Sequence, residues 1–146
     1  MSAQQNYVIF GAAGGIGSET CRLLRNDGSQ LLLAGRSEEN LRELASELDA
    51  PYRVTDATNF EEVAACVQQA EEKLGRIDGI VNCVGSVLLK PAHLTSAEEW
   101  QETIAQNLTS AFAVVRAGAR SMREQGGTIV LMSSAAARIG LSNHEA

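Results

Sequence analysis

The chain has 146 residues, of which 45% are hydrophobic and 21% charged, and its formal net charge is −6. This composition is typical of a single globular domain and excludes disordered and fibrous proteins. The acidic balance, the lack of an apolar run long enough to span a membrane and the polar first residues predict a cytosolic protein that binds neither nucleic acid nor membrane.

The hydrophobic pattern predicts five strands that alternate with helices. Strands are expected at 7–10, 31–34, 52–54, 79–83 and 128–132, and helices from the glycine cluster to about 27, from Ser37 as N-cap past 48, over 60–74 and over about 98–123. Most of the strands are apolar without alternation, as in parallel strands that helices cover on both faces. We therefore predict an α/β fold, a doubly wound parallel sheet in one domain over residues 1–146.

The cysteines and histidines indicate neither a disulfide framework nor a zinc site. Cys21, Cys66 and Cys83 are far apart and have no histidine beside them, so we expect reduced, mostly buried thiols and no metal ligands. His93 and His144 are isolated, and we expect them to be ordinary exposed side chains.

A glycine cluster at 11–17 stands where the first strand passes into a helix. At such a position a phosphate can approach the backbone and the free N–H groups of the helix N-terminus. The spacing fits both G-x-x-x-G-x-G, through Gly15, and G-x-x-G-x-x-G, through Gly14, and it is not a Walker loop. The cluster predicts a nucleotide site; tight turns and helix packing are the alternative explanation.

The second predicted strand ends in Gly35-Arg36-Ser37. Many NAD sites carry an acid here for the ribose 2′-hydroxyl, whereas an arginine suits a 2′-phosphate. Arg36 therefore predicts NADP, with NAD less favoured, unless it is only a surface charge. The missing acid also argues against a methyltransferase.

Six segments in this order resemble the short-chain dehydrogenase/reductase family: 11–17, 35–37, 56–58, 78–85, 107–109 and 129–134. The resemblance implies a Rossmann fold in which the glycine loop holds the pyrophosphate, Arg36 and Ser37 the 2′-phosphate, and Asp56 with Ala57 the adenine. The loop residues concerned are Gly11, Ala13, Gly14, Gly15, Ile16 and Gly17, and the residues implied on the nicotinamide side are Asn82, Val84 and Gly85. Alternatively, Asp56 could close a turn and Asn82 could bind backbone groups at a strand end.

The resemblance also implies hydride transfer between NADP and a small carbonyl or alcohol substrate. Ser134 and Asn107 match the catalytic serine and asparagine of the family, although Ser134 could instead cap a turn. The family's Tyr-x-x-x-Lys pair would begin just past Ala146, so we expect the sequence to be part of a longer protein that also carries the last strands. A partner copy that covers the sheet edge, or a true cofactor-binding half, are the alternatives.

Two departures from the family pattern concern the fine geometry of the site. Phe10 stands in place of a threonine, and Cys83-Val84 in place of Asn-Ala.

A non-catalytic NADP-binding or redox-sensing module is the second hypothesis for function, and a sugar-nucleotide epimerase is a third that Asn82 and the segment 107–109 disfavour. Relatives pair through the helix expected near 98–123, which implies a homodimer or homotetramer.

Overall fold

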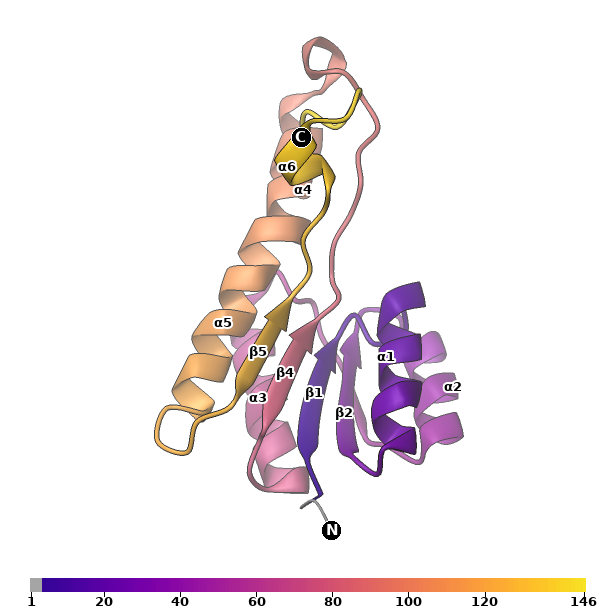
Figure 1. Ribbon diagram of the computed structural model, residues 1–146, viewed down its shortest axis with the longest axis vertical. Coiled ribbons are helices and arrows are strands. Elements are labelled where there is room, and N and C mark those ends of the chain that lie inside the picture. The colour runs from indigo at the N-terminus through magenta and orange to yellow at the C-terminus, as the bar shows by residue number, and fades with distance from the viewer. Residues whose placement is uncertain (1–3) are drawn as a thin grey trace.

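The computed structural model describes residues 4–146 (Figure 1). The predicted strands and helices are present in the predicted order, and most of their ends differ by one or two residues from the prediction. In chain order the elements are β1 (Asn6–Phe10), α1 (Gly15–Asn26), β2 (Gln30–Gly35), α2 (Glu38–Leu48), β3 (Tyr52–Val54), α3 (Phe60–Leu74), β4 (Gly79–Asn82), α4 (Ala97–Ile104), α5 (Ser110–Ser121), β5 (Thr128–Leu131) and α6 (Ala136–Ile139).

The five strands form one parallel sheet in the order β3-β2-β1-β4-β5. β1 is central, with Val8 paired to Leu32 on one side and to Ile80 on the other. The chain leaves β3 at one edge and re-enters the sheet as β4 beside β1, so the strand order reverses between β1 and β4. In open parallel sheets, ligands bind outside the carboxyl ends of the strands at such a reversal.

Helices cover both faces of the sheet, as predicted (Figure 1). α1 and α2 lie on one face, over a core that includes Ile9, Leu33 and Leu41. α3 and α5 lie on the other face, over a core that includes Val8 and Val63. Both cores are packed with aliphatic side chains, so the sheet is a rigid base for the loops at its carboxyl edge.

The predicted long helix over about 98–123 is interrupted. Residues 105–109 form a π-helical turn between α4 and α5. α5 packs close to the sheet through small residues: a Cβ on Gly118 would lie 2.9 Å from the Cδ1 atoms of Ile80 and Ile129. Two large apolar side chains of the same stretch point outward, Leu108 at 62% and Phe112 at 59% exposure, whereas Val114 and Met122 are buried. Close packing of the helix on the sheet explains why a residue without a side chain, Gly118, lies at this contact.

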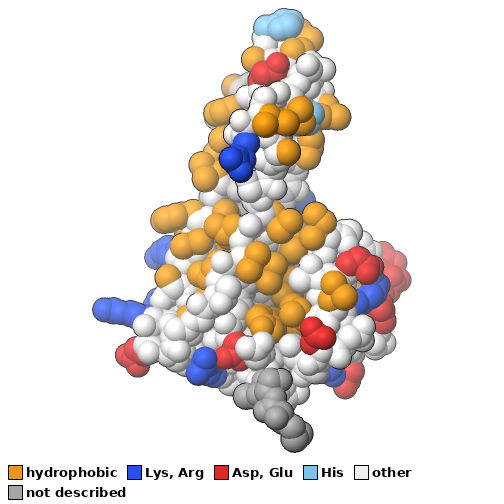
Figure 2. All heavy atoms as spheres, viewed as in Figure 1, with side chains coloured by type: hydrophobic (Ala, Val, Ile, Leu, Met, Phe, Trp, Pro, Cys, Tyr) orange, Lys and Arg blue, Asp and Glu red, His pale blue; other side chains and the backbone are white. Residues whose placement is uncertain are grey.

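β5 is at the open edge of the sheet. It pairs with β4 on one side, and among the described residues no strand pairs with its other side. The segment after β5 rises beside the segment that leaves β4, and the two are joined where the Lys90 N–H donates to the Asn143 carbonyl at 2.8 Å. Figure 2 shows hydrophobic side chains gathered across the middle of this face and along the protruding part. No helix within residues 4–146 has the length and hydropathy to cross a membrane.

Candidate functional site

The turn between β1 and α1 needs glycine at two positions for different reasons. Gly11 has φ +72°, and a Cβ there would lie 2.9 Å from the Cys83 carbonyl carbon at the end of β4. Gly17 is buried in the first turn of α1, where a Cβ would collide with the Gly11 carbonyl group. The two glycines let the helix, the turn and β4 meet at one point, so part of the cluster is explained by packing.

The other two loop glycines are not packed in this way. Gly14 is the N-cap of α1, and its N–H donates to the Gly11 carbonyl at 3.0 Å. A Cβ on Gly15 would have no described atom within 4 Å. The two glycine spacings in the sequence share Gly11 and Gly17 and differ in whether the middle glycine is Gly14 or Gly15. In the structure Gly15 is the one that faces open space.

The beginning of α1 presents free backbone donors beside this open space. The first hydrogen bond inside the helix runs from the Ser18 N–H to the Gly14 carbonyl at 2.8 Å. The N–H groups of residues 15–17 therefore have no partner within the helix, and they lie at its positive end. Ala13 and Ile16 complete the loop, and Ile16 is exposed. This arrangement can bind an anion such as a pyrophosphate.

The carboxyl end of β4 lies against the glycine turn. The Cys83 N–H donates to the Phe10 carbonyl at 2.9 Å, so the two strand ends are joined. Asn82 is buried, and its Oδ1 accepts a hydrogen bond from the Val84 N–H at 3.2 Å. This is the backbone-binding role that the sequence left open for Asn82, and it holds the segment 82–85 in place.

The carboxyl end of β2 carries a free cation. Arg36 is exposed and forms no hydrogen bond or ion pair within residues 4–146. Ser37 is the N-cap of α2, as predicted, and its Oγ accepts from the Asn40 N–H at 3.4 Å. The guanidinium is therefore available to an anion.

The carboxyl end of β3 is a closed turn. Asp56 Oδ1 accepts hydrogen bonds from the Thr58 N–H at 2.9 Å and the Thr58 hydroxyl at 2.8 Å. The Asp56 N–H donates to Glu62 Oε2 at 2.7 Å, and Ala57 is buried. The turn-closing role proposed for Asp56 is thus present in the structure.

The two predicted catalytic residues lie on different elements, and no hydrogen bond joins them within residues 4–146. Ser134 is exposed just after β5, where its Oγ accepts from the Ala136 N–H at 3.1 Å. Asn107 is in the π-helical turn, and its Oδ1 accepts from the Ser86 N–H at 3.0 Å. Asn107 therefore reaches the segment that follows β4. The sequence prediction missed Ser86, and its position directly after Gly85 is the only signal that could have indicated it.

The three cysteines are thiols whose burial disfavours the thiolate. Burial raises the pKa of the Cys21 thiol to about 12 and that of the Cys66 thiol to about 11, and it also raises the pKa of Cys83. All three are free, as predicted, and Cys21 and Cys66 are buried. In the part of the chain that the structure describes, no group of three or more His, Cys, Asp or Glu side chains could hold a metal ion.

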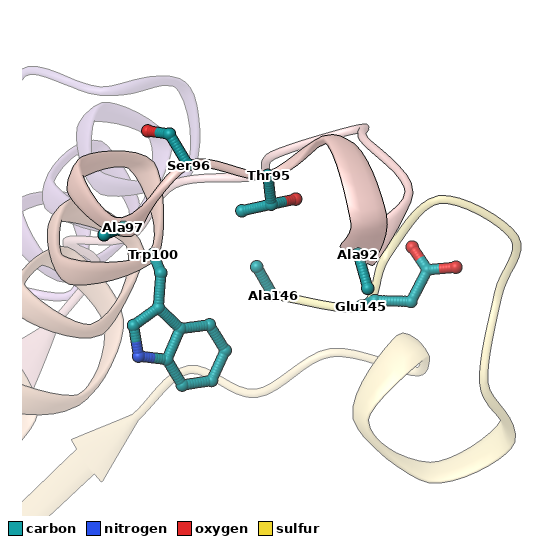
Figure 3. A pocket seen from close by; sticks show the side chains of 7 residues that line it. All are labelled: Ala92, Thr95, Ser96, Ala97, Trp100, Glu145 and Ala146. Atoms are coloured by element: carbon teal, nitrogen blue, oxygen red, sulfur yellow. The ribbon is translucent and has the colours of Figure 1, made fainter.

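A cavity of about 270 Å³ lies between α4 and the last residues of the chain (Figure 3). Trp100 from α4 faces it, whereas the Glu145 carboxylate points away from it. Its lining residues are Ala92, Thr95, Ser96, Ala97, Trp100, Glu145 and Ala146. Four of these seven residues are apolar, and none of them is a predicted site residue.

Sequence comparison finds relatives over most of the chain. Residues 5–146 match the short chain dehydrogenase family. The chain is 29% identical over 155 residues to trans-4-hydroxycyclohexanecarboxylate dehydrogenase of Sinomonas cyclohexanicum, covering 99% of this chain and 60% of that protein. It is 36% identical over 142 residues to acetoacetyl-CoA reductase of an Acinetobacter species, covering 92% of this chain and 57% of that protein.

Solved structures show the same fold. Actinorhodin polyketide ketoreductase with NADPH superposes with a TM-score of 0.93 at 28% identity, over 99% of this chain and 59% of that one. An alcohol dehydrogenase from Thermococcus sibiricus complexed with 5-hydroxy-NADP gives a TM-score of 0.91 at 28% identity, over 97% and 63%. In each of these four comparisons the chain spans less than two thirds of the relative's own length.

Proposed function

Because the chain belongs to the short chain dehydrogenase family, we propose that it carries the coenzyme site of an NADP-dependent oxidoreductase that transfers hydride between nicotinamide and a small carbonyl or alcohol substrate. One observation carries this proposal. The glycine turn lies at the strand-order reversal, packed against the end of β4, and it leaves Gly15 and the free N–H groups of α1 open to a pyrophosphate.

The preference for NADP rests on Arg36. Its guanidinium is exposed and unpaired within residues 4–146, at the strand end where a coenzyme's adenosine ribose would lie. Ser37 stands beside it, with its hydroxyl already used weakly as the cap of α2. NADPH and 5-hydroxy-NADP in the two solved relatives support a phosphorylated coenzyme without deciding the preference.

The other predicted binding residues are assigned to the adenine and nicotinamide ends of the coenzyme. Asp56 and Ala57 would line the adenine through the turn that Asp56 closes. Asn82 would act indirectly, since its Oδ1 is bonded to the Val84 N–H, and Val84 and Gly85 would face the nicotinamide. The coenzyme, when bound, supplies the hydride, and these residues only bind and orient it.

We assign the substrate oxygen to Ser134 and a supporting role to Asn107. The Ser134 hydroxyl is exposed beside the carboxyl end of β5 and can donate a hydrogen bond to a carbonyl oxygen. A second candidate function is a non-catalytic NADP-binding or redox-sensing module, which would use the same glycine turn and the same exposed Arg36. A paired assembly and a cytosolic location remain predictions from the sequence.

Calorimetric titration of the chain with NADPH and NADH tests the coenzyme site. We expect binding of NADPH that is tighter than that of NADH, and the absence of binding to either would contradict the proposal. Hydride transfer by the full-length gene product, followed by NADPH absorbance with a panel of ketones and aldehydes, separates the two functions: turnover supports the oxidoreductase, and binding without turnover supports the module.

A further inference from the structure

Ser86 and Asn107 form a closed pair of hydrogen bonds between the end of β4 and the π-helical turn. The Ser86 N–H donates to Asn107 Oδ1 at 3.0 Å, and Asn107 Nδ2 donates to Ser86 Oγ at 3.1 Å. The two residues are 21 positions apart in the chain. The pair therefore fastens one structural element to another, and it involves the side chain of each residue.

The Asn107 amide has no free donor left. Its Nδ2 also donates to the Thr103 carbonyl at 2.9 Å, so both hydrogens of the amide are used. A rotated amide would place Nδ2 against the Ser86 N–H and Oδ1 against the Thr103 carbonyl. Since both contacts would be repulsive, the hydrogen-bond network determines the orientation of the amide.

Substitution of Ser86 would remove only one of the two hydrogen bonds, the one that its hydroxyl accepts from Asn107 Nδ2. Without the hydroxyl, one hydrogen of Asn107 Nδ2 loses its acceptor, while the bond from the Ser86 N–H remains. The hydroxyl's own hydrogen has no acceptor within residues 4–146, so it can turn to a ligand without breaking the pair. The segments are also tightly apposed, because a Cβ on Gly85 would lie 3.0 Å from Asn107 Oδ1.

We propose that Ser86 is a positioning residue for the nicotinamide half of the coenzyme. Its hydroxyl holds the Asn107 amide, and the amide in turn holds the backbone of residues 84–86 in one arrangement. This inference rests on the proposed function, which places the nicotinamide against Val84 and Gly85. It predicts that the hydroxyl matters for the nicotinamide half and not for the adenosine half.

Two ligands separate the halves of the coenzyme. NADPH contains both, whereas adenosine 2′,5′-bisphosphate contains only the adenosine half with its 2′-phosphate. We expect Ser86→Ala to weaken NADPH binding about fivefold, the usual effect of one hydrogen bond, with no change for adenosine 2′,5′-bisphosphate. Ser86→Thr keeps a hydroxyl and should retain wild-type affinity for both ligands. Calorimetric titration of the three proteins measures these affinities.

The side-chain amide of Asn107 gives a readout that does not depend on any ligand. In the wild-type chain both Nδ2 hydrogens are bonded, so both should show slowed exchange with water by NMR. In Ser86→Ala one of them should exchange faster, and in Ser86→Thr neither should.

Each outcome decides the inference. Equal loss of both ligands in Ser86→Ala, unchanged NADPH binding, or unchanged amide exchange would overturn the positioning role while leaving the proposed function intact. Failure of the wild-type chain to bind either ligand would overturn both the positioning role and the proposed function. This failure is distinguishable from the others because it is seen in the wild-type chain, without any variant.

Discussion

β1 and β5 are both short, apolar, parallel strands, yet their surroundings differ completely. Val8 and Ile9 in β1 have 0% exposure, between two neighbouring strands and under helices on both faces. In β5, Leu131 is 44% exposed, and among the described residues β4 is the only strand beside it. Strand sequence alone does not reveal burial, because burial depends on what lies on either side of the strand.

The contrast extends to the proposed coenzyme site. The glycine turn, the ends of β1 and β4 and the start of α1 meet over the fully packed centre of the sheet. Ser134 follows the exposed strand β5. Its hydroxyl is bonded only locally, to the Ala136 N–H two residues further along the chain. The coenzyme-binding part of the site is therefore held by the core, whereas the part that would meet substrate is less supported within residues 4–146.

The largest effect is expected where the glycine turn packs most tightly. Gly17→Ala brings a Cβ against the Gly11 carbonyl, so we expect a loss of about 3 kcal/mol in the free energy of unfolding and the loss of NADPH binding. Gly15→Ala is the matched control, since its Cβ meets open space. It should leave urea unfolding unchanged and weaken only NADPH binding. Equal stability of the two variants would show that the turn is not packed as described.

Two leucines compare the centre and the edge of the sheet directly. Leu32 in β2 has 0% exposure and Leu131 in β5 has 44%. We expect Leu32→Ala to lower the free energy of unfolding by about 3 kcal/mol and Leu131→Ala by less than about 1 kcal/mol. Urea denaturation followed by circular dichroism measures both. Similar losses would mean that β5 is covered in solution.

The buried thiols make the packed centre sensitive to alkaline pH. Burial raises the pKa of Cys66 from 9.0 to about 11, so the folded chain keeps this proton after the unfolded chain has lost it. Stability from the protonated thiol is full below pH 9 and is lost as the pH rises towards 11, by about 2 kcal/mol at pH 10.5. Urea unfolding at pH 8 and 10.5 measures this loss. Cys66→Ala should reduce this loss of stability between pH 8 and 10.5. An equal loss in the variant and the wild type would argue against the Cys66 thiol as its cause.

The smallest effect concerns coenzyme choice and leaves the fold unchanged. Arg36→Asp removes the cation at the end of β2 and should weaken NADPH binding by at least about tenfold, with a smaller change for NADH. Arg42→Asp, on the exposed side of α2, makes the same change in net charge and should have little effect. Equal losses for NADPH and NADH in Arg36→Asp would remove Arg36 from the 2′-phosphate site.

The sheet and its helices could be predicted from local patterns. The apolar runs and the cap residue Ser37 identified the elements, and Gly75 marked the end of α3. The glycine cluster identified the turn at β1. Its spacing did not separate Gly14 from Gly15, because the difference lies in what surrounds each residue and not in their order.

The features that could not be predicted depend on contacts between distant segments. The pattern over 98–123 predicted one helix, but the Asn107 side chain takes the Thr103 carbonyl in the middle of it. Such side-chain competition accompanies a break in the regular ladder. The outward-facing Leu108 and Phe112 could not be foreseen either, since the close approach of Gly118 to the sheet selects the inner face of α5.

From its amino-acid order alone, this protein is recognisable as a parallel α/β domain with a glycine-rich turn after its first strand, because hydrophobic periodicity and glycine placement are local properties. Which glycine stays open, which cation stays unpaired and which serine holds Asn107 are settled in the folded chain. The first two depend on what the packed chain leaves uncovered, and the third depends on two segments 21 positions apart that come within hydrogen-bond distance only after folding.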